Sequence, residues 1–354
     1  MRLRALRGLL FLLFLTGSAQ AMDNPYRLLT SPELPEFVAT TLPTFWQQHA
    51  QPGELMGTGH VPIRYVALRN PASHNAILLV SGRMESYIKY QELAYELFQQ
   101  GYSVYLYDHR GQGFSGRMLS DPHKGYVVDF NDYVADLKLF RDQVVQADQP
   151  NRLFLLSHSM GGAIAAHYLQ QYPHDIHAAV LASPMFGIDL GLLPNWLARW
   201  VTGLLEWLTQ LLGIESPYAP SQGPYDPLPF ADNELTHDEQ RYAQFRAVYQ
   251  HYPEVQLGGP TARWVNLAIP FAEQAIQAGQ QIHTPLLLLQ AGADQVVSNE
   301  EQLAFCEQMR QGGHPCAGGQ PVVIAEARHE LLNESDEFRI PALNATLRFF
   351  EQQP

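Results

Sequence analysis

Residues 153–168, LFLLSHSMGGAIAAHY, decide the fold class of this chain. The run LFLL is apolar and short enough for a buried strand, and the run AIAA favours a helix. Between them a tight turn carries Ser159 at its tip, followed closely by Gly161 and Gly162. A strand, a turn with a serine and a helix are the context in which a G-x-S-x-G motif forms a nucleophile elbow. Ser157 replaces the first glycine of that motif, and its small side chain is compatible with the same turn.

Apolar strand patterns alternate with helical patterns along the chain. Strands are expected at residues 61–68, 76–80, 103–107, 178–182, 285–290 and 321–324, and helical patterns at 90–100 and 130–146. Such alternation is typical of an α/β fold with a mostly parallel sheet covered by helices on both faces. Residues 23–53 contain Pro25, Pro32, Pro35 and Pro43 and are expected to form an irregular lead-in with one short helix.

A serine hydroxyl becomes a nucleophile when a base accepts its proton and a carboxylate orients that base. Asp294 follows the strand predicted at 285–290, and His329 follows the one at 321–324. Taken singly, an aspartate in a turn or one of 14 histidines is more often structural. The order Ser, Asp, His, each just past the carboxyl end of a strand, favours a catalytic triad of Ser159, Asp294 and His329.

An acyl-transfer site also needs N–H donors for the oxyanion. The backbone N–H of Met160 directly follows the nucleophile, and the turn after strand 76–80 is expected to supply the second donor from Arg83. The neighbouring Gly82 lets the backbone turn its amides inward.

The glycines of residues 111–116, GQGFSG, match the spacing of a dinucleotide-binding loop. That motif has to open a helix whose N-terminus holds pyrophosphate, whereas here no helix is expected before about residue 130. We interpret the loop as a tight exit from the sheet beside the active site. No metal and no organic cofactor is implied.

The formal net charge of −13 excludes some partners. A chain this acidic is not expected to bind nucleic acid, nor to adhere to anionic lipid by electrostatic attraction alone.

Residues 1–21 predict a secretory signal peptide. Three arginines precede an apolar run at 9–15, and Ala19-Gln20-Ala21 is a small-x-small cleavage site before Met22. An exported protein is therefore expected, periplasmic or peripheral to the membrane. The alternatives are that Met22 is the true start, which would place the protein at the cytoplasmic face of the inner membrane, or that the segment is an uncleaved anchor.

The two cysteines, Cys306 and Cys316, agree with export. In an oxidising compartment they are expected to form a disulfide, the alternative being two unpaired thiols. They occur in no CxxC motif and near no histidine cluster, so a metal site is not indicated.

Several segments resemble bacterial lysophospholipases of the monoacylglycerol-lipase-like branch of the α/β hydrolases. They are SGRMESYIKY, DHRGQGFSGRMLSDPHKGY, LLSHSMGGAIA, ASPMFGI, GGPTARW, AGADQVV and ARHELLNESD, spread over residues 65–350. The resemblance implies an α/β-hydrolase fold, the triad named above, an oxyanion hole of Arg83 and Met160, and a monoacyl lipid substrate. The exported N-terminus departs from the family pattern, so location is not carried over.

With 354 residues the chain can hold one α/β domain with an insertion. We divide it into a signal peptide (1–21), a first part of the core (22–184), a helical cap or lid (185–284) and a second part of the core (285–354).

The first predicted cap helix is unusually apolar. Trp196, Trp200 and Trp207 follow one another at helical spacing, and a narrow polar stripe includes Thr202 and Glu206. Such a helix can pack on the core, line an acyl channel or touch a membrane interface. We favour a lid that contacts lipid, with these tryptophans binding substrate.

Arginines of the insertion are candidates for a phosphate headgroup. Arg241 and Arg246 belong to a second cap helix expected at 236–251, and Arg263 follows it. Arg263 is our candidate for substrate binding, although solvated surface is the alternative for each of the three.

Together these patterns predict an exported serine esterase that removes the acyl chain from a lysophospholipid. A monoacylglycerol lipase or general carboxylesterase is the nearer alternative, and a lipid-binding protein with an inactive triad is the non-enzymatic one. The oligomeric state, acyl-chain length and positional preference do not follow from the sequence.

Overall fold

The computed structural model describes residues 23–188 and 194–353. The predicted signal peptide, residues 1–21, lies outside the described residues.

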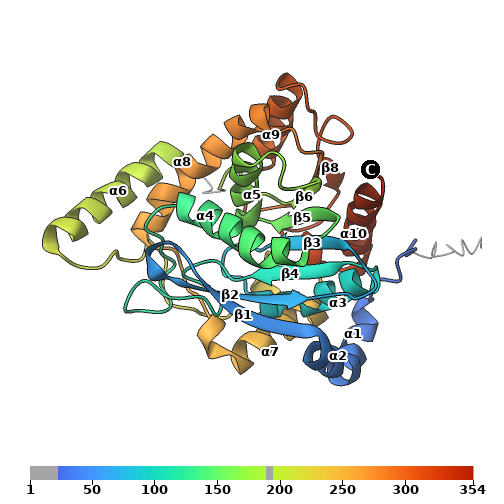
Figure 1. The fold of residues 1–354 in the computed structure, drawn as a ribbon. Coiled ribbons are helices and arrows are strands. Elements are labelled where there is room, and N and C mark those ends of the chain that lie inside the picture. Colours follow the sequence, from blue (N-terminus) through green and yellow to red (C-terminus); the bar gives the residue numbers. More distant parts are fainter. Residues whose placement is uncertain (1–22, 189–193, 354) are drawn as a thin grey trace, which may run out of the picture.

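An eight-stranded sheet forms the centre of the fold, in the order β1-β2-β4-β3-β5-β6-β7-β8 (Figure 1). The strands from β3 to β8 run parallel, whereas β2 pairs antiparallel with both β1 and β4. The predicted mostly parallel α/β sheet is therefore confirmed. The strands are β1 (Ala50–Met56), β2 (Pro62–Leu68), β3 (Asn75–Val80), β4 (Ser103–Tyr107), β5 (Arg152–His158), β6 (Ala178–Ala182), β7 (Leu286–Ala291) and β8 (Val322–Ile324).

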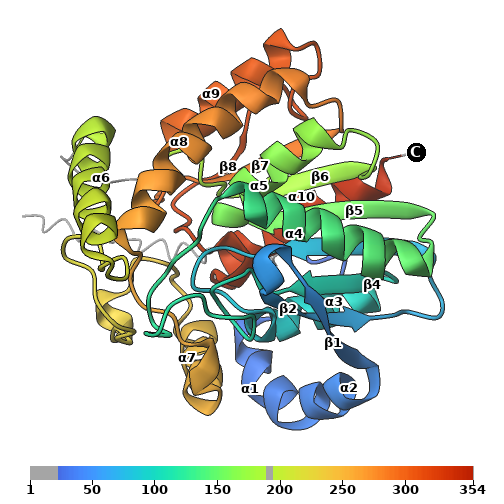
Figure 2. The same cartoon turned by 60° about the vertical axis from the view of Figure 1, so that its left-hand side comes forward.

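Helices cover both faces of the sheet (Figures 1 and 2). One apolar core includes Leu137 of α4 and Ile164 of α5, and the opposite core includes Leu97 of α3 and Leu343 of α10. Central strands are buried on both sides, which explains why they read as continuous apolar runs. The α-helices are α1 (Leu34–Glu36), α2 (Leu42–His49), α3 (Gln91–Gln99), α4 (Asn131–Phe140), α5 (Met160–Gln171), α6 (Asn195–Leu212), α7 (Glu239–His251), α8 (Ala262–Ala278), α9 (Asn299–Gln311) and α10 (Asp336–Glu351).

The prediction of an irregular lead-in was wrong. Helical segments follow one another from Ser31 to His49, and Pro32, Pro35 and Pro43 each stand in the first turn of one of them. Proline is favourable at position 32, where the helical run begins, because the N–H that it lacks would have no partner within the helix. Pro35 and Pro43 fall just after the points where the run changes from one helix type to the next. The chain then forms β1, which contains Pro52 and, in the described residues, pairs with β2 alone. An edge strand tolerates proline, so Pro52 does not interrupt β1.

The segment between β6 and β7 carries α6, α7 and α8. Helix α8 packs against both α6 and α5, and it buries Trp264 and Phe271 in the same core as α5. The last part of the predicted cap is therefore also part of the helical layer over the sheet.

Helix α6 turns its polar stripe toward the protein and its apolar face outward. Thr202 and Glu206 are buried, whereas Trp196, Trp200 and Trp207 are 69%, 62% and 58% exposed. Eight of the fourteen exposed large hydrophobic residues in the described chain lie between residues 196 and 214. No helix within residues 23–188 and 194–353 is both long and apolar enough to cross a membrane.

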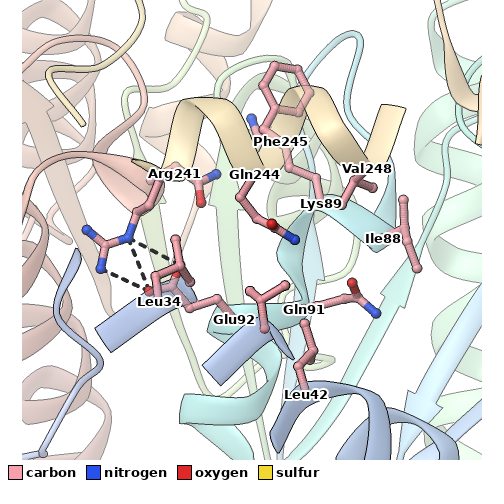
Figure 3. Close-up of a pocket in the computed structure, with 12 residues that line it drawn as sticks. Leu34, Leu42, Ile88, Lys89, Gln91, Glu92, Arg241, Gln244, Phe245 and Val248 are labelled. Carbon is pink, nitrogen blue, oxygen red and sulfur yellow. Dashed lines mark hydrogen bonds and ion pairs between the residues drawn. The ribbon is translucent and has the colours of Figure 1, made fainter. Parts of the chain in front are cut away.

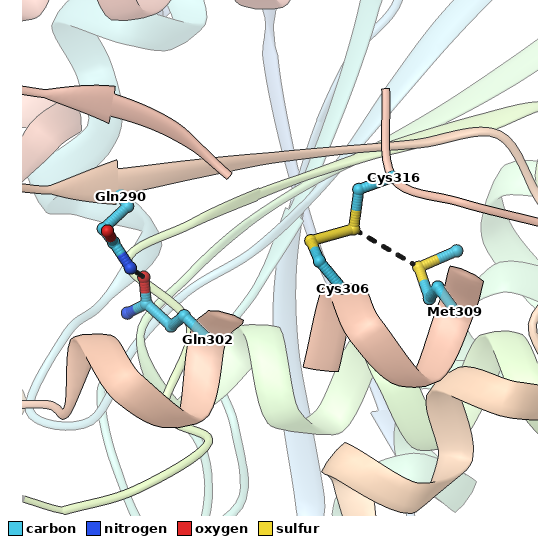
Figure 4. Close-up of a disulfide and its surroundings, with 5 residues drawn as sticks. All are labelled: Gln290, Gln302, Cys306, Met309 and Cys316. Carbon is cyan, nitrogen blue, oxygen red and sulfur yellow. Dashed lines mark hydrogen bonds between the residues drawn. A yellow bond between two sulfur atoms is a disulfide. The ribbon is translucent and has the colours of Figure 1, made fainter. Parts of the chain in front are cut away.

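A disulfide joins Cys306 of α9 to Cys316, which precedes β8 (Figure 4). Both residues are buried. The bond ties α9 to the chain that leads through β8 to His329.

Candidate active site

The turn between β5 and α5 presents Ser159. Its backbone has φ 52° and ψ −121°, which is unusual for a residue with a side chain. A Cβ added at Gly161 would overlap the carbonyl oxygens of Val80 and Ser81, and one at Gly162 would overlap Pro184. The start of α5 therefore packs too closely on the chain at the ends of β3 and β6 for any larger residue, and the serine hydroxyl is exposed to the site at the top of the turn.

The structure brings together the three residues predicted as a triad. His329 Nε2 lies 2.9 Å from Ser159 Oγ, and His329 Nδ1 lies 2.8 Å from Asp294 Oδ2. The three residues come from the loops after β5, β7 and β8. Because a carboxylate can only accept, Nδ1 carries the proton and leaves Nε2 free to accept the hydrogen bond of the serine hydroxyl.

Asp294 is held as a carboxylate. Its Oδ1 accepts hydrogen bonds from the backbone N–H groups of Val296 and Val297, at 2.8 Å and 3.1 Å. Burial raises the pKa of Asp294, but the hydrogen bond and charge of His329 and these two N–H groups outweigh it and lower the pKa. The ionised form fixes the histidine ring and its tautomer.

Two backbone N–H groups near Ser159 are candidates for the oxyanion donors. In the described residues, the N–H groups of Met160 and Arg83 donate to no protein acceptor. A Cβ added at Gly82 would lie 3.0 Å from the Cβ of Ser159, so the turn of residues 82–83 is beside the nucleophile. Both donors are available for a developing negative charge on a substrate carbonyl oxygen.

A cavity of about 820 Å³ opens over Ser159 and His329. Helix α6 contributes Ala198, Val201 and Thr202 to its lining, and α8 contributes Trp264 and Val265. The volume and the mainly apolar lining suit a lipid-sized ligand with one polar end.

The structure places the predicted substrate contacts of α6 and α8 outside the cavity lining. Trp196, Trp200 and Trp207 are outside the cavity lining because α6 presents its opposite stripe to the site. Arg263 donates to the carbonyl oxygens of Val127 and Val128 and pairs with Glu206 at 3.3 Å, so it is occupied elsewhere.

Arg241 is likewise committed to structure. It pairs with Glu92, Asp238 and Asp336 beneath α7, and the contact with Glu92 is visible in Figure 3. The hollow beside it, of about 30 Å³, has room for one or two water molecules and not for a substrate. Of the three arginines considered for a headgroup, only Arg246 lines the large cavity.

A buried charge cluster that sequence reasoning missed lies behind the triad, formed by Glu85, Lys89, His158 and Glu330. The Lys89 ammonium lies 2.6 Å from Glu85 and 2.7 Å from Glu330. His158 Nδ1 lies 3.2 Å from Glu85, and its Nε2 lies 3.1 Å from the carbonyl oxygen of His329. The sequence held one indication of this cluster, because two of its members are neighbours of predicted triad residues: His158 precedes Ser159, and Glu330 follows His329.

Both ring nitrogens of His158 face acceptors, so the imidazole is doubly protonated. Burial lowers the pKa of His158, but the carboxylates of Glu85 and Glu330 outweigh it and raise the pKa to about 9. Glu85 also accepts from the backbone N–H of Gly82. The cluster thus joins the elbow, the turn of the oxyanion donor and the loop of His329.

Glu85, His158 and Glu330 have the spacing of metal ligands, with their atoms within 4.8 Å of one another. Lys89 reaches both carboxylates and supplies the positive charge that a cation would bring. The donor set is therefore satisfied by an internal ammonium.

The glycine-rich loop braces this region from behind. Gln112 Nε2 donates to the carbonyl oxygens of Gly82 and Glu85, and His109 Nε2 donates to that of Ser81 at 2.9 Å. Gly113 has φ 55° and packs on Asp108, where a side chain would not fit. No α-helix follows until α4 begins at Asn131, as expected for a structural loop.

Known proteins are similar to this chain in sequence. The family model described as serine aminopeptidase S33 matches residues 71–336. The chain is 42% identical to lysophospholipase L2 of Escherichia coli K12 over 316 residues, covering 89% of this chain and 92% of that protein. It is 33% identical to the probable lysophospholipase L2 of Haemophilus influenzae over 336 residues, covering 92% and 100%.

Solved structures support the fold. A carboxyl esterase from Bacillus coagulans superposes with a TM-score of 0.68 at 16% identity, over 86% of this chain and 99% of that one. A monoglyceride lipase from Saccharomyces cerevisiae gives a TM-score of 0.64 at 18% identity, over 86% and 97%.

The raised pKa of His158 predicts a pH dependence of stability. A pKa of about 9 in the folded chain, above the model-peptide value of 6.5, contributes stability that is complete below pH 6.5 and is lost as the pH rises through 9. The free energy of unfolding in urea should be larger for wild type than for His158→Gln. This difference should fall by about 3 kcal/mol as the pH rises over this interval. A difference that stays constant with pH would contradict the charged state of His158.

Proposed function

Because the chain belongs to the α/β hydrolases of the serine aminopeptidase S33 family, among the bacterial lysophospholipases, we propose that it deacylates lysophospholipids through an acyl-enzyme on Ser159. It is an ester hydrolase. The proposal is carried by one observation: Ser159, His329 and Asp294 are hydrogen-bonded in series at the floor of a lipid-sized cavity.

Each group in the site has a role in this reaction. His329 Nε2 accepts the proton of Ser159 as Oγ attacks the ester carbonyl, and Asp294 stabilises the resulting imidazolium. The N–H groups of Met160 and Arg83 receive the oxyanion. The glycerophospho alcohol leaves with the proton from His329. Water then hydrolyses the acyl-enzyme by the same groups and releases the fatty acid.

The outward apolar face of α6 supports contact with a lipid surface. Its three tryptophans and Leu204, Leu208, Leu211 and Leu212 are more than one-third exposed. Its buried polar stripe is already used within the protein. An exposed apolar patch next to a lipid-ester site fits the interface of a membrane, where Trp is favoured. Because the chain carries a net charge of −13, we propose apolar insertion into a zwitterionic surface and not charge attraction.

Export is the second part of the proposal. The arginines and apolar run of residues 1–15 support it, and the disulfide Cys306–Cys316 is of the kind that persists in an oxidising compartment.

Replacement of Ser159 tests the chemistry. Ser159→Ala should release fatty acid at least about 10⁴-fold more slowly than wild type, because the nucleophile is gone while the fold is kept. Fatty acid release should be measured from lysophosphatidylethanolamine, lysophosphatidylcholine and monoacylglycerol of equal acyl length. We expect wild type to prefer the phospholipids. Equal or faster cleavage of monoacylglycerol would instead make the chain a monoacylglycerol lipase.

Acidic substitutions on α6 test the membrane contact. Trp200→Glu with Leu211→Glu should weaken binding to phosphatidylcholine vesicles at least about tenfold, since each removes an inserted apolar side chain. Hydrolysis of a soluble short-chain ester should stay unchanged. Leu303→Glu on α9 is the matched control. Equal vesicle binding by the α6 variant and this control would exclude α6 as the contact.

Intact mass of protein from its native compartment tests export. The expected mass is that of residues 22–354 with one disulfide. A mass that includes residues 1–21 together with two free thiols would contradict both the cleaved signal peptide and the disulfide.

A further inference from the structure

Two arginines line the active-site cavity without a carboxylate partner. In the described residues, the guanidinium groups of Arg83 and Arg246 form no ion pair. In contrast, Arg241 and Arg263, which lie in the same insertion as Arg246, are paired with acidic side chains. Arg83 and Arg246 therefore bring positive charge to the cavity without a paired carboxylate.

Arg246 of α7 is held by neutral groups alone. Its Nη1 donates to the hydroxyl of Tyr225 at 3.1 Å and its Nη2 to that of Tyr242 at 2.7 Å. The guanidinium lies over the rings of Tyr242 and Phe245, 4.8 Å from each centroid. Its Nε is buried and has no hydrogen-bond partner. A guanidinium has five N–H donors, so the majority remain available while the aromatic rings fix the plane.

Arg83 adds a second uncompensated charge. Its Nη2 donates to the carbonyl oxygen of Gly258 at 2.6 Å, it lies 5.2 Å from the ring centroid of Trp264, and its Nε has no partner. Burial lowers the pKa of Arg83 to about 10, so the group is still cationic at neutral pH. A bound anion would offset the cost of this buried charge.

The other charges around the cavity sum to one negative charge. Glu85 and Glu330 are balanced by Lys89 and His158, and the carboxylate of Asp294, hydrogen-bonded to His329 Nδ1, adds one negative charge. The two guanidiniums without a carboxylate partner therefore give this region a positive excess inside a protein of net charge −13.

We propose that Arg246, assisted by the charge of Arg83, binds the phosphate group of the substrate. This assignment rests on the proposed function and names the part of the site that separates lysophospholipids from neutral monoacyl lipids. A planar guanidinium with several free donors suits phosphate oxygens, which it can bind by two parallel hydrogen bonds. The headgroup then lies toward α7, and the acyl chain lies along the apolar residues of α6 and α8.

Replacement of Arg246 tests the site through substrate discrimination. Arg246→Gln should lower kcat/KM for lysophosphatidylethanolamine by about tenfold or more, because a charge-assisted contact is lost. The value for monoacylglycerol of the same acyl chain should change less than about twofold. Arg263→Gln, which lies outside the cavity, is the matched control and should move both substrates equally. Equal losses on both substrates in Arg246→Gln would overturn the assignment.

Inhibition of monoacylglycerol hydrolysis tests the phosphate site independently of the proposed lysophospholipid substrate. In wild type, sn-glycerol 3-phosphate should inhibit monoacylglycerol hydrolysis competitively, and Arg246→Gln should weaken this inhibition about tenfold. Inorganic phosphate in parallel shows whether the site takes free phosphate or needs the glycerol ester. If wild type prefers monoacylglycerol, the lysophospholipase proposal fails, and weakened inhibition in the variant still supports the phosphate site. Inhibition equal in both proteins would refute it.

Discussion

The packing of the first turn of α5 against the ends of β3 and β6 is the constraint on which the site depends. A side chain at residue 161 would overlap the carbonyl oxygens of Val80 and Ser81, and one at residue 162 would overlap Pro184, so both have to be glycine. Ser159 at the turn adopts φ 52°. This backbone is costly for a residue with a side chain, and the surrounding sheet maintains it. In return, the hydroxyl of Ser159 lies at the turn where His329 arrives from the loop after β8, and Met160 follows it directly in the chain. The parallel strands bring these loops to one edge of the sheet.

A network of buried charged residues holds those loops in position. His158, next to the nucleophile, reaches the carbonyl oxygen of His329 and the carboxylate of Glu85, and Glu85 in turn accepts from Gly82. Removal of one partner would leave a buried charge unpaired, which is more costly than the pair is favourable. The elements that supply the nucleophile, the base and the oxyanion donor are thus coupled by one network. The residues that hold the catalytic loops in place therefore also contribute to the stability of the fold.

Residue patterns within short segments predicted the strands and the order of the triad residues. The apolar runs of β3 to β7 and the chain order of Ser159, Asp294 and His329 place the sheet and the site, because burial and loop position are visible in sequence. The prolines misled because their effect depends on position: in a first helical turn or an edge strand they are tolerated. The side of α6 that lines the cavity also escaped prediction, since the helix buries Thr202 and Glu206 toward the protein and exposes Trp200, which was expected to bind substrate. Pairings across distant segments, such as Arg241 with Glu92, decide which arginines stay free, and no local pattern carries that information.

The most direct measurement of the central claim is covalent labelling of the nucleophile. Wild-type protein is treated with a fluorophosphonate, digested, and the modified peptide is identified by mass spectrometry. The account predicts one adduct, on Ser159, and a rate of labelling that drops sharply in His329→Ala because the base is lost. Absence of labelling, or an adduct on another serine with Ser159 unmodified, would contradict the triad and with it the assignment of the cavity as an ester-hydrolase site.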